Sequence, residues 1–107
     1  MIQQLTVHEL KARLDQGKND FMLIDVREPW EHGICELPSA TAIPMRAIPA
    51  RYMDLPKDTE LVLMCHHGVR SQQVAYFLER QGFTRLANLV GGIAAWSREI
   101  DPALPTY

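Results

Sequence analysis

Two short, nearly continuous apolar runs most constrain the fold of this chain. They occupy residues 21–26, Phe-Met-Leu-Ile-Asp-Val, and residues 60–65, Glu-Leu-Val-Leu-Met-Cys. Such runs are typical of strands that are covered on both faces, as in a parallel sheet. Further strands are expected at 40–44 and 83–90, and helices at 7–16, 29–32, 46–53, 71–81 and 93–99. This alternation predicts an α/β fold with an open, mostly parallel sheet and helices on both faces.

Local signals set several of the helix ends. Thr6 and Glu9 have the spacing of a capping box, in which each side chain bonds to a free N–H group of the first turn. Gly17 and Gly82 stand where left-handed caps would end the helices before them. Pro29 fits the first turn of the short helix that it begins.

The length of 107 residues corresponds to one domain and leaves no room for two. A formal charge of −2 lacks the basic character of nucleic-acid-binding proteins. No apolar run approaches the roughly 18 residues that span a bilayer. The first residues, Met-Ile-Gln-Gln-Leu-Thr, do not resemble a signal peptide. We therefore expect a cytoplasmic protein with neither a nucleic-acid nor a membrane partner.

The sequence contains two cysteines, Cys35 and Cys65. Without an export signal they are expected to be reduced. Two thiols cannot form a four-ligand zinc site, and their separation matches no paired zinc-ligand spacing. We expect no metal and no organic cofactor.

Cys65 lies at the carboxyl end of a predicted buried strand, where ligands bind in open α/β sheets. Backbone N–H groups of the following loop and the start of the next helix favour negative charge, and hence a thiolate. Gly68 permits a tight turn, and Arg70 supplies a permanent cation that can hold an oxyanion through two hydrogen bonds. A small buried hydrophobic cysteine is the alternative interpretation. The combination with Gly68 and Arg70 favours a reactive thiol.

Four motifs, in order along the chain, resemble those of the rhodanese (thiosulfate sulfurtransferase) superfamily. They are Leu23-Ile-Asp-Val-Arg-Glu, Pro38-Ser-Ala-Thr-Ala-Ile-Pro, Cys65-His-His-Gly-Val-Arg-Ser and Gly91-Gly-Ile-Ala-Ala-Trp. The resemblance implies a single rhodanese domain over residues 1–107, with about five strands, a core near 5–99 and a tail at 100–107. It also implies sulfur transfer through a persulfide on Cys65, which a thiolate nucleophile would form in a ping-pong reaction.

The resemblance implies substrate-binding positions in the loop that follows the nucleophile: His66, His67, Gly68, Val69 and Arg70. Asp25, Arg27 and Ser71 are expected to support the loop. Asp25 and Arg27 are interpreted as a structural ion pair, with contact between Arg27 and substrate as the alternative. The implied partners are a small sulfur donor, thiosulfate or a persulfide, and a thiol or sulfur-carrier protein as acceptor. The expected assembly is a monomer or weak homodimer.

Loop length distinguishes two related chemistries. The similar dual-specificity phosphatases place five residues between cysteine and arginine, whereas four lie between Cys65 and Arg70. The shorter loop favours a single sulfur atom over a phosphoryl group. A non-catalytic docking or redox-sensing module is the main alternative, and reduction of arsenate or peroxide is a weaker one.

Two histidines and one segment required separate interpretations. His66 and His67 are expected to point apart and to shape the mouth of the site, with thiosulfate binding tightening as the pH falls toward 6.

Cys35-Glu36 departs from the family's usual Gly-His at this place, and the Glu36 carboxylate is expected to repel anionic donors. Cys35 is interpreted as an inert buried thiol, with a resolving role as the alternative. Both tryptophans are expected to pack in the core or at its rim: Trp30 and Trp96.

Overall fold

The computed structural model describes residues 1–17 and 20–107. Within these residues the strands are β1 (Ile2–Leu5), β2 (Phe21–Asp25), β3 (Thr41–Ala42), β4 (Glu60–Met64) and β5 (Leu86–Leu89). The α-helices are α1 (Val7–Asp15), α2 (Pro29–His32), α3 (Ile48–Arg51), α4 (Val69–Arg80) and α5 (Gly92–Glu99). Two 3₁₀ turns, η1 (Met45–Ala47) and η2 (Tyr52–Asp54), flank α3.

The strands form one sheet in the order β1-β5-β4-β2-β3, and each described pairing is parallel. The predicted α/β class is thereby confirmed. Strand β1 was not predicted, because Gln3 and Gln4 at its centre are exposed and no apolar run marks it. Among the described strands, β1 pairs with β5 alone and lies at the edge of the sheet.

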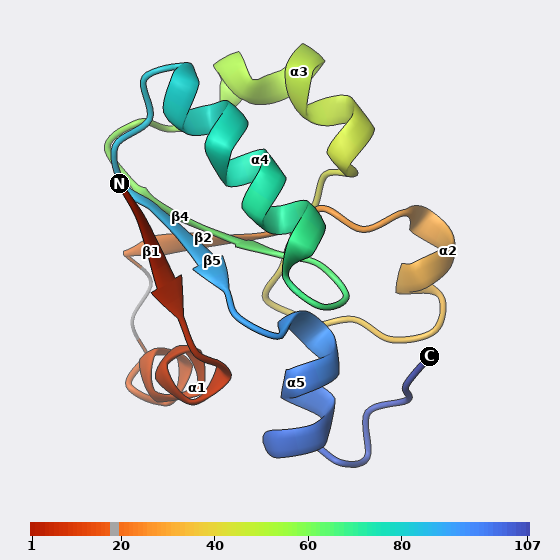
Figure 1. Ribbon diagram of the computed structural model, residues 1–107. Helices are drawn as coiled ribbons and strands as arrows, with labels where there is room; N and C mark the ends of the chain where they lie inside the picture. The colour runs from red at the N-terminus through yellow and green to blue at the C-terminus, as the bar shows by residue number, and fades with distance from the viewer. Residues whose placement is uncertain (18–19) are drawn as a thin grey trace.

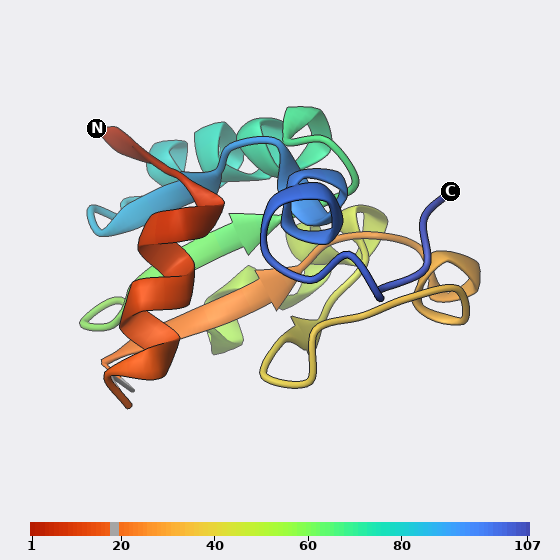
Figure 2. The ribbon, with the colours of Figure 1, turned by 90° about the horizontal axis from the view of Figure 1, so that it is seen from below.

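Helices cover both faces of the sheet. Helices α1 and α5 lie on one face and α3 and α4 on the other (Figure 1; Figure 2). Each face has its own apolar core, and β4 contributes to both because its side chains alternate. Leu61 and Leu63 join the core under α4, whereas Val62 and Met64 join the core beneath α1 and α5.

Two helices differ from their predicted bounds by more than one residue. Helix α4 begins at Val69 rather than at residue 71, since Gly68 adopts a left-handed conformation (φ +103°) and acts as its N-cap. The helix expected at 46–53 consists instead of η1, α3 and η2, with Pro49 in the first turn of α3. The capping box of α1 is present, with Glu9 N–H donating to Thr6 Oγ1 and Thr6 N–H donating to Glu9 Oε1.

After α5 the chain turns back, and residues 101–107 run past the carboxyl ends of the strands toward α2 (Figure 1; Figure 2). Within the described part of the chain, no helix is long and apolar enough to cross a membrane.

Candidate active site

Cys65 follows β4 directly and is 1% exposed. The left-handed turn at Gly68 brings its backbone N–H to within 3.0 Å of Cys65 Sγ, to which it donates. Helix α4 begins at the next residue, so its amino-terminal end lies beside the sulfur. Both features favour negative charge on Sγ. The loop thus has the geometry of a cradle for a thiolate.

The first turn of α5 holds the same loop from the other side. Ile93 N–H donates to the Cys65 carbonyl at 2.9 Å, and Ala94 N–H donates to the His66 carbonyl at 3.0 Å. The N–H groups at a helix start lack partners within the helix, and here they bind the cysteine loop. Gly92 permits this contact, because a Cβ there would lie 2.5 Å from the His66 carbonyl oxygen.

A buried polar network lies behind the sulfur. Ser71 Oγ is 3.4 Å from Cys65 Sγ and donates to Asn88 Oδ1 at 2.5 Å. Asn88 Nδ2 donates in turn to the Gly68 carbonyl at 3.3 Å and to Gln4 Oε1 at 3.2 Å. Asn88 was missed by the sequence analysis, although a polar residue inside the apolar run of β5 is the signal that marks it. The network fixes Ser71 and the turn at Gly68 together.

Asp25 and Arg27 form a fully buried ion pair, with 2.7 Å between Arg27 Nη2 and Asp25 Oδ2. Arg27 also donates from Nη2 to the Cys35 carbonyl at 2.9 Å. Burial alone lowers the pKa of Arg27, but its hydrogen bonds to Asp25 and Tyr107 outweigh that effect and raise it. The pair ties the end of β2 to the segment after α2.

Arg70 makes two parallel hydrogen bonds to a carboxylate that the sequence analysis did not identify. Its Nη1 and Nη2 donate to the two carboxylate oxygens of Glu31 at 2.7 and 2.8 Å. Glu31 is 2% exposed, and the hydrogen bond from Arg70 is the main cause that lowers its pKa to about 2. Glu31 also accepts a hydrogen bond from the backbone N–H of Glu28, the N-cap residue of α2. The carboxylate that contacts Arg70 is therefore Glu31, whereas Glu36 lies at the surface beside His32.

The rings of His66 and His67 do not point apart, so that expectation was wrong. Their centroids are 3.9 Å apart with an interplanar angle of 33°. The other face of His66 stacks on Tyr107, with centroids 3.8 Å apart and planes within 5°. The hydrogen-bonded turn toward α5 fixes the backbone of His66, and the two aromatic neighbours hold its ring.

The remaining predicted residues occupy varied environments. Val69 is 67% exposed at the start of α4. Cys35 is buried and free, 4.0 Å from Arg27 Nη1. Trp96 is buried in the core under α5, as expected. Trp30 is 64% exposed and makes a T-shaped contact with Tyr107, with 5.9 Å between the ring centroids.

Comparison with known proteins identifies the family. The rhodanese-like domain family model matches residues 6–99. The chain belongs to the rhodanese-like domain family. A protein of Allochromatium vinosum named "Sulfurtransferase" is 39% identical over 98 residues, covering 92% of this chain and 91% of the relative. The "Putative sulfurtransferase YtwF" of Bacillus subtilis is 37% identical over 101 residues, covering 94% of this chain and 96% of the relative.

A solved structure agrees with this assignment. The crystal structure of a rhodanese-like domain protein from Staphylococcus aureus is 32% identical, with a TM-score of 0.84 and 99% of each chain covered. Several other relatives are longer proteins, of which this chain spans 22–38%. The five-stranded rhodanese-like fold is thus confirmed, and the relatives support sulfur transfer as the general chemistry.

The arrangement in this rhodanese-like domain suits a covalent reaction at sulfur. Cys65 Sγ is placed to act as a nucleophile, and Gly68 N–H and the start of α4 are placed to stabilise negative charge on it. No group of three or more histidine, cysteine or acidic side chains in the described residues is placed to hold a metal ion.

The environment of His66 makes a pH prediction. Burial and the nearby His67 lower the pKa of His66, and Arg70 acts in the same direction, whereas Glu31 and Tyr107 act against it. His66 therefore gains its positive charge only below the ordinary histidine range, at lower pH than the sequence analysis expected. We expect the KM for thiosulfate to fall only when the pH drops below the ordinary histidine range, because the imidazolium attracts the dianion. Steady-state kinetics of wild type and His66→Gln check this, and a wild-type profile that matches the variant would contradict it.

Proposed function

We propose that this chain transfers sulfane sulfur from a donor such as thiosulfate to a thiophilic acceptor through a persulfide on Cys65. The observation that carries the proposal is the buried Sγ that accepts the Gly68 N–H at the start of α4. An anion-binding turn is of little use to an inert core cysteine but stabilises a thiolate or a persulfide anion. The reaction belongs to the cytoplasm and requires no bound cofactor.

In the first half-reaction the Cys65 thiolate attacks the outer sulfur of thiosulfate. A new S–S bond forms to Cys65, the S–S bond of thiosulfate breaks, and sulfite leaves with the bonding electrons. The outer sulfur of the resulting persulfide carries the negative charge, which the loop N–H groups stabilise. The sulfur atom that thiosulfate loses is the outer sulfur of the Cys65 persulfide, so the step balances.

In the second half-reaction a thiolate acceptor attacks that outer sulfur. The acceptor leaves as a persulfide, and Cys65 returns to its thiolate form, so the cycle is ping-pong. We propose a small thiol or a sulfur-carrier protein as this acceptor. Residues of the loop mouth, His66, His67 and Val69, are the contacts that we assign to it.

Arg70 is assigned to the donor's oxygens. A guanidinium has five N–H groups, and the bonds to Glu31 use two of them. Arg70 is 33% exposed, so its other N–H groups can reach a bound anion. Glu31 offsets the charge of Arg70, which weakens the attraction for a dianion. A small donor whose reacting group carries a single negative charge, such as a persulfide anion, fits this balance better than the thiosulfate dianion.

The mass of the intact protein after incubation with thiosulfate tests the proposal. We expect a gain of about 32 Da, one sulfur atom, that cyanide removes. Peptide mapping should place the added sulfur on Cys65. Cys35→Ser is the matched control, because it deletes the other thiol and should retain the full gain.

The same measurement with a small persulfide donor, such as cysteine persulfide, covers the case in which thiosulfate is a poor donor. Absence of an adduct with either donor would contradict sulfur transfer. That outcome would instead favour the docking or redox-sensing module.

A further inference from the structure

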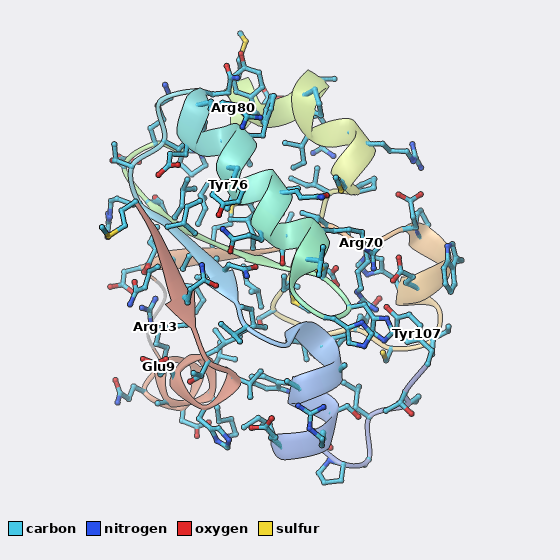
Figure 3. All side chains as sticks on the ribbon, viewed as in Figure 1. Glu9, Arg13, Arg70, Tyr76, Arg80 and Tyr107 are labelled. Atoms are coloured by element: carbon cyan, nitrogen blue, oxygen red, sulfur yellow. The ribbon has the colours of Figure 1, made fainter. Side chains whose placement is uncertain are left out.

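The segment that follows α5 is fastened beside the cysteine loop. Ser97 Oγ donates to the Leu104 carbonyl at 2.8 Å, and Asp101 N–H donates to the Trp96 carbonyl at 2.9 Å. These bonds turn residues 101–107 back across α5 toward α2 (Figure 2). Figure 3 shows Tyr107 near Arg70, at the end of the sheet where the loop lies.

This segment and the loop enclose a small cavity. Pro105, Thr106 and Tyr107 line one side of it, and His66 and Cys35 line another. The cavity lies on the His66 side of the loop, and Cys65 does not line it. Tyr107 therefore bounds that side of the loop rather than the sulfur itself. Nothing in the mechanism above uses this side chain.

Three kinds of contact hold Tyr107. Its ring stacks on His66, and its hydroxyl donates to Glu31 Oε2 at 2.6 Å and accepts from Arg27 Nη1 at 3.0 Å. Hydrogen bonds to charged partners are the stronger ones in proteins. Burial and the bond to Glu31 contribute to a pKa of about 12 for Tyr107, so the hydroxyl keeps its proton at neutral pH. These contacts hold the Tyr107 ring in one position against His66 and the small cavity.

We infer that Tyr107 is a specificity-determining residue of the Cys65 site: its ring covers the His66 side of the loop, and its hydroxyl bonds hold the ring there. The site then admits small sulfur donors and excludes bulky ones unless Tyr107 is displaced. The inference rests on the proposed function only in that the molecules admitted to the site are sulfur donors. Access to Cys65 is measurable with reagents that require no sulfur transfer.

Thiol alkylation at Cys65 tests the inference. The rates are measured in a Cys35→Ser background with two reagents of different size, iodoacetamide and a maleimide attached to a polyethylene glycol chain. Tyr107→Ala removes the ring and the hydroxyl, and Tyr107→Phe removes the hydroxyl alone. Tyr76→Ala is the matched control, since Tyr76 is 51% exposed on α4 and lies away from Tyr107 (Figure 3).

We expect Tyr107→Ala to raise the rate constant for the bulky maleimide about tenfold and that for iodoacetamide by less than about threefold. Tyr107→Phe should give an intermediate rise, and Tyr76→Ala should match wild type. A uniform loss of structure would accelerate both reagents equally. Equal acceleration, or rates for Tyr107→Ala that match wild type, would overturn the inference.

Sulfur transfer provides the second readout. For Tyr107→Ala we expect the ratio of kcat/KM for a bulky persulfide to kcat/KM for thiosulfate to rise about tenfold. Failure of the proposed function would remove both activities while leaving the alkylation result intact. Failure of the inference would leave the ratio unchanged in an active protein.

Discussion

Replacement of Cys65 by serine is expected to lower sulfur transfer by at least about a thousandfold, because a hydroxyl does not form the persulfide. The side chains are nearly isosteric, and the hydroxyl can accept the Gly68 N–H that the thiol accepts. The fold should therefore survive, and thermal unfolding should remain close to that of wild type. Steady-state assays with thiosulfate and with a persulfide donor, together with intact mass, measure the effect.

Cys35→Ser supplies the contrast to this variant. Cys35 is buried, and its neighbours are Arg27 and the wall of the small cavity. We expect its activity to stay within about twofold of wild type. Equal losses in the two variants would assign the chemistry to a cysteine pair. Retention of activity in Cys65→Ser would exclude the persulfide mechanism.

The largest effect on stability is expected from Gly92→Ala. Gly92 has φ +59°, and a Cβ would lie 2.5 Å from the His66 carbonyl oxygen. That oxygen belongs to the backbone and accepts from Ala94, so it cannot move aside cheaply. We expect a loss of about 3 kcal/mol or more in the free energy of unfolding, from backbone strain and steric overlap together. Urea unfolding followed by circular dichroism measures it.

Gly17→Ala isolates the strain from the overlap. Gly17 has φ +69°, but a Cβ there would meet no atom of the described residues within 4 Å. We expect this control to lose about 1 kcal/mol from conformational strain alone. Equal losses at the two positions would mean that the contact between α5 and the cysteine loop is unimportant. Gly92→Ala should also slow sulfur transfer, since the added Cβ would displace the backbone of His66 and Cys65.

The parts of the fold that could be predicted are those with a local cause. Strands β2 and β4 were predicted from apolar runs, since such runs are buried wherever the sheet places them. Helix α1 was predicted from the capping box of Thr6 and Glu9. The place of Cys65 at a strand end and the turn at Gly68 likewise depend on adjacent residues.

The parts that were missed depend on contacts between distant residues. Arg70 and Glu31 are separated by 39 positions, and Tyr107 and Glu31 by 76. No periodicity within one helix or strand carries such a pairing. The face-to-face arrangement of His66 and His67 arises in the same way, because α5 and Tyr107 fix the first ring.

Strand β1 lies at the edge of the sheet, but hydrogen bonds through Asn88 link it to the turn at Gly68. Gln4 of β1 accepts a hydrogen bond from Asn88, and Asn88 also donates to the carbonyl of Gly68. One side chain therefore separates the first strand from the turn that contacts the nucleophile. Fusion partners or deletions that disturb residues 2–5 would change the reactivity of a thiol 60 positions later in the sequence.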